Sequence, residues 1–411
     1  MKYGLIGQKL GHSFSKDIHE KIGRYAYVHK ELEPEDVGTF LKAREFEGLN
    51  VTIPYKQTVI PYLDELSDLA REVGAVNTIV NRDGKLIGYN TDVGGMKILI
   101  GSMGLDPAGK TVLIAGSGGT SRTAARVAGD LGAAEIIRVS RSGRDGAITY
   151  EDAYRDHPDA SILINTTPAG MYPDINGMPF DIESFDSLEG VLDVVYNPLT
   201  PAFIRKAQEK GIPAVNGLYM LVSQAVLAAE IFTGEPVDRS EIDRIYRELM
   251  VEKRNIVLTG MPCSGKTTQG KLLSERFSRE LVETDDVIVA MAGMSISDIF
   301  SKYGEQHFRD LESAAIMDAS KLGGKVISTG GGAILRKENV DALKMNGIVV
   351  FLDRPLEDLI PSDDRPLAND EQKIRALHEK RYPIYSAAAD VTVRVDGTQI
   401  QTADDIWGAI Q

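Results

Sequence analysis

An eight-residue stretch in the second half of the chain, Gly260 to Thr267, constrains the fold most strongly. It reads Gly-Met-Pro-Cys-Ser-Gly-Lys-Thr and fits the pattern G-x-x-x-x-G-K-[ST]. The apolar run 255–258 precedes it, and apolar residues at helical spacing follow over 269–277. Strand, glycine loop and helix in this order are the context of a phosphate-binding loop, because glycines let backbone N–H groups turn toward an anion. Lys266 is then expected to reach the β- and γ-phosphates of a nucleotide, and Thr267 to ligate Mg²⁺.

The loop begins near residue 255 of a 411-residue chain, so the preceding residues need a separate explanation. A chain of this length predicts two or three domains. No apolar run approaches the roughly 20 residues of a membrane span. The single cysteine excludes an intrachain disulfide and a cysteine-based metal cluster. With no apolar leader at the N-terminus, a cytoplasmic location is expected. The net charge of −14 argues against general nucleic-acid binding, and the oligomeric state stays open.

Apolar runs with strand character alternate with helical patterns along the whole chain, which predicts an α/β architecture with mostly parallel sheets. Residues 238–254 form a charged, amphipathic pattern and predict a helix that leads into the phosphate loop. No Gly/Ser/Pro-rich linker separates the halves, and the expected boundary lies at 251–254. The expected strands are 3–6, 111–115, 135–139, 162–164 and 191–194 in the first half, then 255–259, 325–328, 348–352 and 391–395.

A second glycine-rich loop, 116–122, follows the apolar run 110–115 and precedes a helical pattern. It resembles the dinucleotide loop of Rossmann domains, in which a pyrophosphate lies at a helix N-terminus, although Ser121 replaces the third glycine. The next strand ends in Ser140-Arg141-Ser142, where an NAD-binding protein usually carries an acid. An arginine flanked by hydroxyls suits a 2′-phosphate, so the pattern favours NADP(H) over NAD. The alternative is an exposed arginine on a βα loop.

Several clusters of polar residues lie in the first 100 residues. Singly, they have ordinary interpretations as turn residues or solvated charges. Together they resemble the shikimate dehydrogenase family over about residues 1–250, in the family's motif order. The matching segments are the serine pair Ser13 and Ser15, Asn50–Lys56, Asn77 in Ala-Val-Asn-Thr, Asp92 in Tyr-Asn-Thr-Asp, 164–171, 193–198 and 217–224.

This resemblance implies reversible, NADPH-dependent reduction of 3-dehydroshikimate to shikimate. Lys56 and Asp92 would be the catalytic pair, and which of them moves the proton is left open. Ser13 and Ser15 would hold the substrate carboxylate. The remaining substrate contacts would be Thr52, Asn77, Tyr196 and Gln224. The cofactor contacts would be Gly116, Gly118, Gly119, Thr120, Ser121, Arg122, Ser140, Arg141, Ser142 and Gly217. The implied domains are a discontinuous substrate domain, 1–100 and 216–250, and a Rossmann domain, 101–215.

Three further segments follow the phosphate loop: Glu283-Thr284-Asp285-Asp286 after a short strand, 304–309 at the start of a helix, and 329–332 at the end of a strand. With the loop, they resemble the shikimate kinase family over about residues 254–411, a P-loop fold like that of the nucleoside monophosphate kinases. Two departures stand out: Glu283 replaces the family's first acid, the residue that the resemblance implies contacts Mg²⁺ through water, and the lid, about 356–368, is short.

The kinase resemblance implies the following roles. Asp285 would contact substrate hydroxyls and act as base, and Arg309 and Arg381 would hold the carboxylate. Arg365 would be the lid arginine. Gly331 and Gly332 would line the substrate. ATP would contact Gly260, Pro262, Cys263, Ser264, Gly265, Lys266, Thr267 and Thr268.

The product of the first implied reaction is the substrate of the second, so the two resemblances predict a fused, bifunctional enzyme. A rival from another class is a non-catalytic sensor of a shikimate-like metabolite. That reading is disfavoured because Lys56, Asp92, Lys266 and Asp285 are all present. A second rival keeps both chemistries but changes the substrates to quinate or to another small polyol.

Overall fold

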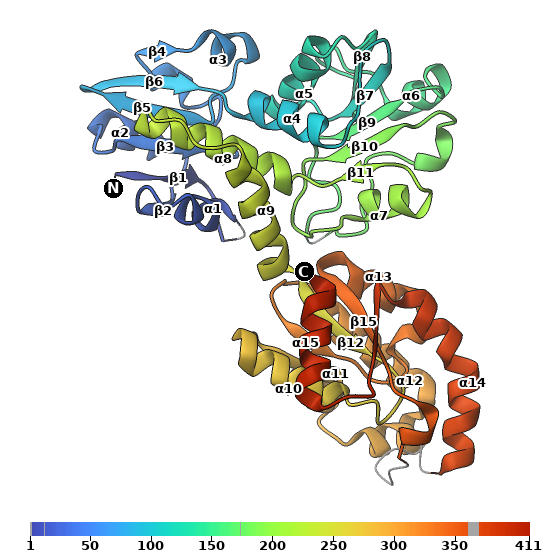
Figure 1. The fold of residues 1–411 in the computed structure, drawn as a ribbon. Helices are drawn as coiled ribbons and strands as arrows, with labels where there is room; N and C mark the ends of the chain where they lie inside the picture. The colour runs from blue at the N-terminus through green and yellow to red at the C-terminus, as the bar shows by residue number, and fades with distance from the viewer. Residues whose placement is uncertain (1, 12, 173, 361–369) are drawn as a thin grey trace. The chain divides into compact units, whose positions relative to one another are not determined.

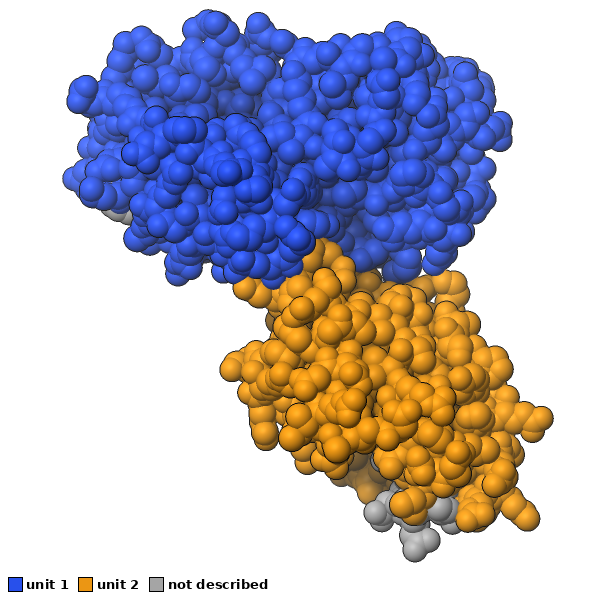
Figure 2. Space-filling view, in the orientation of Figure 1, with its two compact units in different colours: residues 1–248 blue, residues 249–411 orange. Residues whose placement is uncertain are grey.

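The computed structural model describes residues 2–11, 13–172, 174–360 and 370–411. The chain forms two compact units, residues 1–248 and 249–411, which are coloured separately in Figure 2. Helix α9 (Ser240–Lys253) crosses the boundary and leads directly into strand β12 (Asn255–Thr259). The prediction of α/β architecture is confirmed. No helix among the described residues is both long and apolar enough to cross a membrane.

The first sheet of unit 1 is mixed. Its strand order is β2-β1-β3-β5-β6-β4, and β5 runs antiparallel to both of its neighbours. The expectation of mostly parallel sheets did not anticipate this hairpin. Asp83 and Gly84 join β5 to β6 with positive φ angles of 52° and 83°, the turn chemistry that closes a two-residue hairpin. The strands are β1 (Tyr3–Gly7), β2 (Tyr27–Glu31), β3 (Gly48–Val51), β4 (Glu65–Leu66), β5 (Thr78–Arg82) and β6 (Lys85–Tyr89).

The second sheet of unit 1 has the order β11-β10-β9-β7-β8, and all its described pairs are parallel (Figure 1). Apart from the edge strand β8, its strands read as largely apolar runs because both faces are covered. In β7, Val112 and Ile114 enter the core shared with α4 and α5, whereas Leu113 and Ala115 enter the core that contains α7. The strands are β7 (Thr111–Ala115), β8 (Glu135–Val139), β9 (Ile162–Asn165), β10 (Gly190–Asp193) and β11 (Ala214–Val215).

Among the helices of unit 1, one packs against segments from the beginning of the chain. Helix α8 (Leu218–Thr233) returns late in the chain and packs against α1 and α4, which belong to the first 102 residues. It thereby brings a distant segment beside the first sheet (Figure 1). The other helices are α1 (Ser15–Ile22), α2 (Val37–Ala43), α3 (Asp68–Val73), α4 (Asp92–Ser102), α5 (Gly119–Asp130), α6 (Tyr150–Asp156) and α7 (Ala202–Glu209).

Unit 2 contains one sheet in the order β13-β14-β12-β15-β16, and all its described pairs are parallel. Besides β12, its strands are β13 (Leu281–Glu283), β14 (Val326–Ser328), β15 (Gly347–Asp353) and β16 (Val391–Arg394). Its helices are α10 (Lys266–Phe277), α11 (Thr284–Ala292), α12 (Ile296–Ser320), α13 (Lys337–Asn346), α14 (Glu371–Ala388) and α15 (Gln399–Ile410). Short 3₁₀ turns occur at Ile60–Tyr62, Ile182–Ser184, Ala333–Leu335 and Leu356–Asp358.

The predicted element bounds differ little from the observed ones. Strands 111–115, 135–139 and 255–259 have the predicted bounds, and each of the others differs by one residue at one or both ends. The prediction that a helix begins at Gly304 is wrong. Helical turns lie on both sides of Gly304, whose φ of 82° and ψ of 173° break α12 there, a conformation that glycine alone adopts easily.

Candidate active sites in the two units

In unit 1, Lys56 and Asp92 form a direct ion pair. Lys56 Nζ lies 2.6 Å from Asp92 Oδ2, and the two side chains are 21% and 9% exposed. Lys56 lies on the loop after β3, and Asp92 is the first residue of α4. The carbonyl of Lys56 accepts from Val76 N at 2.8 Å, which holds this loop against the segment before β5. The pair combines a proton donor and an acceptor in a half-buried place.

Asn77 is the centre of the hydrogen bonds around Asp92. Its Nδ2 donates to Asp92 Oδ1 at 2.9 Å, and its Oδ1 accepts from Thr91 N at 2.8 Å. Gln224 of α8 joins this group, because its Oε1 accepts from Thr91 Oγ1 at 3.2 Å and lies 3.4 Å from Asn77 Nδ2. The structure thus brings together four predicted residues, Lys56, Asn77, Asp92 and Gln224, from segments that lie far apart in the sequence.

A buried layer behind Asn77 was missed by sequence reasoning. Asn50 Nδ2 donates to Thr78 Oγ1 at 3.1 Å, and Thr78 Oγ1 donates to Asn77 Oδ1 at the same distance. The Tyr27 hydroxyl donates to Asn50 Oδ1 at 2.7 Å. Tyr27 stacks on His19, and burial lowers the pKa of His19 to about 3, so this imidazole is neutral. Thr78 lies inside a motif and was open to prediction, whereas no local pattern marks Tyr27.

Ser13, Ser15 and Tyr196 form a second group. The Ser13 hydroxyl donates to Ser15 Oγ at 3.1 Å. Burial raises the pKa of Tyr196, although its hydrogen bond with Ser13 opposes the effect, so the phenol is neutral. Tyr196 follows the second sheet and Ser13 the first, so this contact links the two parts of unit 1. Thr52, half-buried, lies on the same loop after β3 as Lys56, and its amide donates to Ile6 O at 3.0 Å.

The glycine-rich loop of unit 1, 116–122, fits a dinucleotide. Gly116 has a φ of 121°, and a Cβ there would collide with Thr166 Oγ1, whereas a Cβ at Gly118 would meet no atom within 4 Å. The loop is therefore tightly packed at Gly116 and open at Gly118, next to the start of α5 at Gly119. The first amides of a helix have no partner within it and attract anions. Ser121 replaces the third glycine without distorting the turn, because its buried hydroxyl donates to Gly118 O at 2.8 Å.

The other predicted NADP contacts lie at neighbouring strand ends. Ser140, Arg141 and Ser142 follow β8, with Arg141 and Ser142 exposed. Gly217 precedes α8, and a Cβ there would overlap the backbone of Val194 after β10. These strand ends share one edge of a parallel sheet, where α/β proteins bind ligands. Thr120 and Arg122 lie in the first turn of α5. These residues fit an NADP molecule.

In unit 2, the phosphate loop has the backbone that its motif predicts. Gly260, Cys263 and Gly265 have φ angles of 151°, 67° and 97°, so several amides turn inward. Lys266 Nζ donates to Gly260 O at 3.0 Å and to Met261 O at 2.9 Å. Ser264 Oγ is buried without a hydrogen-bond partner among the described residues, as expected of a group that awaits a ligand.

The start of α10 faces the end of β13. Thr267 Oγ1 lies 3.4 Å from Glu283 Oε2, and Thr268 follows it on the helix. A hydroxyl and a carboxylate are ligands that suit Mg²⁺, so these residues fit a magnesium ion held beside a nucleotide. Pro262 lies on the loop next to the glycine turn after β14, since a Cβ at Gly331 would be 3.3 Å from Pro262 Cδ.

Charged side chains converge on this glycine turn. Arg309 Nη1 donates to Glu312 Oε2 at 2.7 Å, and Arg381 Nη1 donates to Gly331 O at 2.9 Å. A Cβ at Gly330 would lie 2.9 Å from both Asp285 Oδ1 and Glu312 Oε1. A Cβ at Gly332 would overlap the guanidinium of Arg309. The turn therefore requires glycine for close approach, and the predicted residues Asp285, Arg309, Gly331, Gly332 and Arg381 lie together.

Glu312 was missed by sequence reasoning. It is 1% exposed, and burial raises the pKa of its carboxyl against the lowering effect of Arg309. Its Oε1 has no hydrogen-bond partner among the described residues. Its position one helical turn after Arg309 was the available signal, because residues three apart share a helix face. The predicted lid arginine, Arg365, lies outside the described residues.

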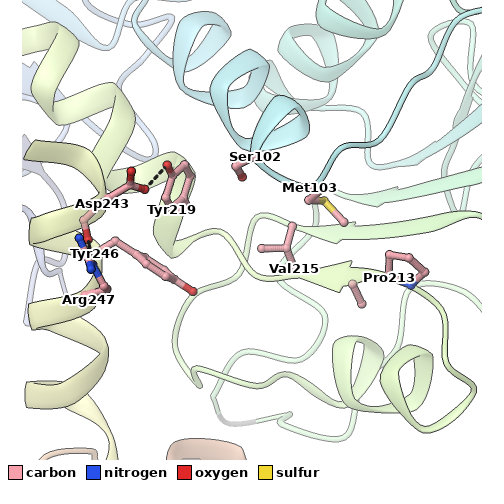
Figure 3. A pocket seen from close by; sticks show the side chains of 9 residues that line it. Ser102, Met103, Pro213, Val215, Tyr219, Asp243, Tyr246 and Arg247 are labelled. Carbon is pink, nitrogen blue, oxygen red and sulfur yellow. Dashed lines mark hydrogen bonds between the residues drawn. The ribbon is translucent and has the colours of Figure 1, made fainter. Parts of the chain in front are cut away.

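A further cavity of about 770 Å³ lies in unit 1 between α4, α8, α9 and β11. In Figure 3, Asp243 points toward Tyr219, whose hydroxyl donates to it at 2.7 Å. Tyr246 and Arg247 line the same cavity from α9. No predicted site residue lines it, so it is separate from the two groups described above.

The geometry agrees with comparisons to known proteins. Residues 5–79 match the family model of the shikimate dehydrogenase substrate-binding domain, and residues 262–411 match that of shikimate kinase. A shikimate dehydrogenase (NADP⁺) from Clostridium perfringens SM101 is 39% identical over 266 residues, covering 60% of this chain and 97% of the relative.

Solved structures show the same likeness. Shikimate dehydrogenase 1 from Peptoclostridium difficile has 35% identity and a TM-score of 0.57, covering 61% of this chain and 98% of its own. Shikimate 5-dehydrogenase from Thermus thermophilus, in complex with NADP(H) and shikimate, has 29% identity and a TM-score of 0.55, covering 60% and 99%. The chain therefore belongs to the shikimate dehydrogenase family and carries a shikimate kinase domain in its second unit.

Proposed function

We propose that the residues gathered in each unit carry out two consecutive reactions. The chain is a bifunctional enzyme of the shikimate pathway, which reduces 3-dehydroshikimate to shikimate with NADPH and then phosphorylates shikimate with ATP. The observation that carries this conclusion is the pairing within one chain of a dehydrogenase and a kinase whose product and substrate coincide. The prediction of a fusion is thereby confirmed.

In unit 1, Lys56 and Asp92 act on the carbonyl oxygen that the reaction turns into a hydroxyl. NADPH, when bound, supplies the hydride. Lys56 Nζ donates a hydrogen bond or a proton to this oxygen, and Asp92, 2.6 Å from Nζ, orients the ammonium and accepts from a substrate hydroxyl. Asn77 keeps the Asp92 carboxylate in place through its 2.9 Å hydrogen bond.

Substrate recognition in unit 1 relies on neutral polar groups. Ser13 and Ser15 bind the carboxylate, and the Tyr196 hydroxyl, which contacts Ser13, lies beside it. Thr52, Asn77 and Gln224 bind ring hydroxyls. The buried layer of Asn50 and Thr78 saturates the far side of Asn77, so that its amide has one orientation.

In unit 2, cationic groups surround two anions. The phosphate-loop amides and Lys266 would hold the nucleotide phosphates, and Thr267, together with Glu283, would hold Mg²⁺, which neutralises charge on the phosphates. Arg309 and Arg381 bind the shikimate carboxylate. Asp285 accepts the proton of the attacking 3-hydroxyl. Glu312 positions Arg309 through their 2.7 Å hydrogen bond.

These roles imply a division of the chain. We assign 1–100 and 216–250 to binding of 3-dehydroshikimate and shikimate, 101–215 to NADP, and 254–411 to phosphoryl transfer. The discontinuity follows from α8, which packs on α1 and α4 and contributes Gln224 beside Asn77. The lid role of Arg365 and a cytoplasmic location stay predictions.

One experiment tests both activities. Purified full-length protein is mixed with 3-dehydroshikimate and NADPH, with and without ATP and Mg²⁺, and the products are identified by mass. We expect shikimate without ATP and shikimate 3-phosphate with it. Reduction without phosphorylation would direct attention to Glu283 and the short lid. Binding without turnover in either unit would favour the metabolite sensor, and faster turnover of quinate would change the substrate of unit 1.

A further inference from the structure

A recess with three guanidinium groups lies beside the proposed NADP site. Its volume is about 240 Å³, and it is lined by Arg122, Arg126 and Arg138 together with Glu72, Val73 and Ala125. Arg122 and Arg126 lie on the first two turns of α5, and Arg138 lies on β8, the edge strand beside β7. Three cations around one small recess repel one another. Such a cluster is also unexpected in a chain of net charge −14.

Only part of this positive charge is neutralised within the recess. Arg126 forms ion pairs with Glu72 and, at 2.7 Å, with Asp130. The single carboxylate that lines the recess is therefore engaged by one of its three arginines. Arg122 and Arg138 are left to give the recess a net positive charge, which is the property of a site for a phosphate or another anion.

Arg138 also ties down the loop that carries the proposed 2′-phosphate contacts. Its carbonyl accepts from Ile148 N at 2.9 Å, and Ser140 N donates to Ile148 O at 2.9 Å, which closes the loop at its base. The Arg138 guanidinium donates to Asp145 O on the same loop. An arginine has five N–H donors, and this contact uses one of them.

The direction of Arg138 is set by the strand. Side chains two residues apart on a strand point to the same face, so Arg138 and Ile136, both within β8, share one. Ile136 packs on the α5 side of the sheet, 3.5 Å from a Cβ built on Gly129. This face leads toward the first turn of α5, where the cofactor pyrophosphate is proposed to bind. Arg138 lies about 6.6 Å along the strand from Ser140, given a rise of about 3.3 Å per residue.

We propose that Arg138 is a specificity-determining residue that, with Arg122, binds the 2′-phosphate of NADP(H) from the α5 side, opposite Arg141. This inference rests on the proposed function of unit 1 and adds a residue to it. Nothing in the local sequence marks Arg138, because a single charged residue within a strand has an ordinary interpretation as a solvated side chain. The recess and the contact with Asp145 are what single it out.

The test compares two probes that differ by one phosphate. With unit 2 saturated by a non-hydrolysable ATP analogue and Mg²⁺, so that both probes report on unit 1, calorimetry measures binding of 2′,5′-ADP and 5′-ADP to full-length wild type, Arg138→Gln, Arg138→Lys and the control Arg155→Gln. Arg155 is an exposed arginine paired with Asp152 and Asp156 on α6. We expect Arg138→Gln to weaken 2′,5′-ADP at least about tenfold, as for loss of a hydrogen bond to a charged group, and to leave 5′-ADP within about twofold.

Arg138→Lys keeps the charge and is expected to lose severalfold in 2′,5′-ADP binding, so it carries the test if Arg138→Gln does not fold. Arg155→Gln should match wild type. Unchanged 2′,5′-ADP binding in both Arg138 variants, or equal losses for both probes, would overturn the inference. A wild type that does not prefer 2′,5′-ADP over 5′-ADP would instead contradict the proposed use of NADP.

Discussion

The proposed reacting groups of unit 1 have mainly neutral surroundings, whereas those of unit 2 have charged ones. In unit 1, one ion pair, Lys56 and Asp92, is surrounded by buried neutral groups such as Asn50, Asn77 and Gln224. In unit 2, buried charges cluster, and Lys266, Arg309, Glu312 and Arg381 are 7%, 8%, 1% and 6% exposed. The proposed reactions explain the difference. Reduction of a carbonyl needs one proton, whereas phosphoryl transfer needs cations around the phosphates and a carboxylate.

This contrast predicts different responses to substitution. A neutral hydrogen bond contributes about 1 kcal/mol, so the layer around Asn77 is tolerant of small changes. A buried charge that loses its partner costs about 3–5 kcal/mol. We therefore expect substitutions in unit 1 to change rates more than stability, and substitutions in unit 2 to change both.

The largest effect is expected at the ion pair of unit 1. Lys56→Ala removes the ammonium proposed to bind the carbonyl oxygen, and we expect reduction to slow by about 10²–10⁴-fold with phosphorylation of supplied shikimate unchanged. Both rates are measured on the same preparation. The matched control is Lys85→Ala, which removes an exposed Lys–Glu pair from the same unit. Equal activity in Lys56→Ala and Lys85→Ala would contradict the role of Lys56.

The reciprocal change is Lys266→Ala. It removes the cation of the phosphate loop, and we expect phosphorylation to slow by about 10²–10³-fold, as for loss of one preorganised donor to developing charge. Reduction should be unaffected. Lys271→Ala changes an exposed lysine on the same helix and should leave both rates unchanged. Loss of reduction in Lys266→Ala would show that the two activities are not separable.

Stability sharpens the comparison. Glu312→Gln removes the buried one of the two carboxylates that pair with Arg309 and leaves Glu305, which is 57% exposed, so we expect unit 2 to lose about 3 kcal/mol of its free energy of unfolding. Tyr27→Phe in unit 1 removes a neutral hydrogen bond to Asn50 and is expected to cost about 1 kcal/mol.

Denaturant titration distinguishes the two units. The single tryptophan, Trp407, lies in α15 and stacks on Phe277, so its fluorescence reports on unit 2, and near-ultraviolet circular dichroism also follows the tyrosines of unit 1. If Glu312→Gln costs no more than Tyr27→Phe, the supposed difference between charged and neutral surroundings is wrong.

The last prediction concerns the pH dependence of stability. Burial raises the pKa of Asp193 to about 8, so the native chain holds a proton that the unfolded chain releases near its ordinary value of 3.8. Because the native state binds more protons, this group's stabilisation is complete below pH 4 and is lost as the pH rises toward 8. Asp193→Asn mimics the protonated form and should remove a slope of about 1 kcal/mol per pH unit between pH 5 and 7. Parallel stability curves for wild type and variant would show that Asp193 is ionised throughout.

Local patterns predicted much of the fold. The apolar runs of β7 and β12 gave correct bounds because strands covered on both faces need few polar residues. The Asp83-Gly84 turn is also a local signal, and it indicates the antiparallel hairpin that the prediction of mostly parallel sheets omitted. Gly304 was predicted to begin a helix, but it interrupts one. A glycine can do either, and the packing of the neighbouring residues decides between the two.

The sequence by itself determined the chemistry available: two glycine loops with different spacing, the lysine and threonine of the phosphate loop, and the motif residues that resemble two families. These signals depend on short-range backbone geometry, which neighbouring residues specify. Only the tertiary structure decided that Gln224 joins Asn77, that Glu312 is buried against the glycine turn after β14, that Tyr27 supports Asn50, and that Arg138 lies in a basic recess. The physical reason is that burial, charge pairing and hydrogen-bond saturation depend on segments that meet only when the chain is folded.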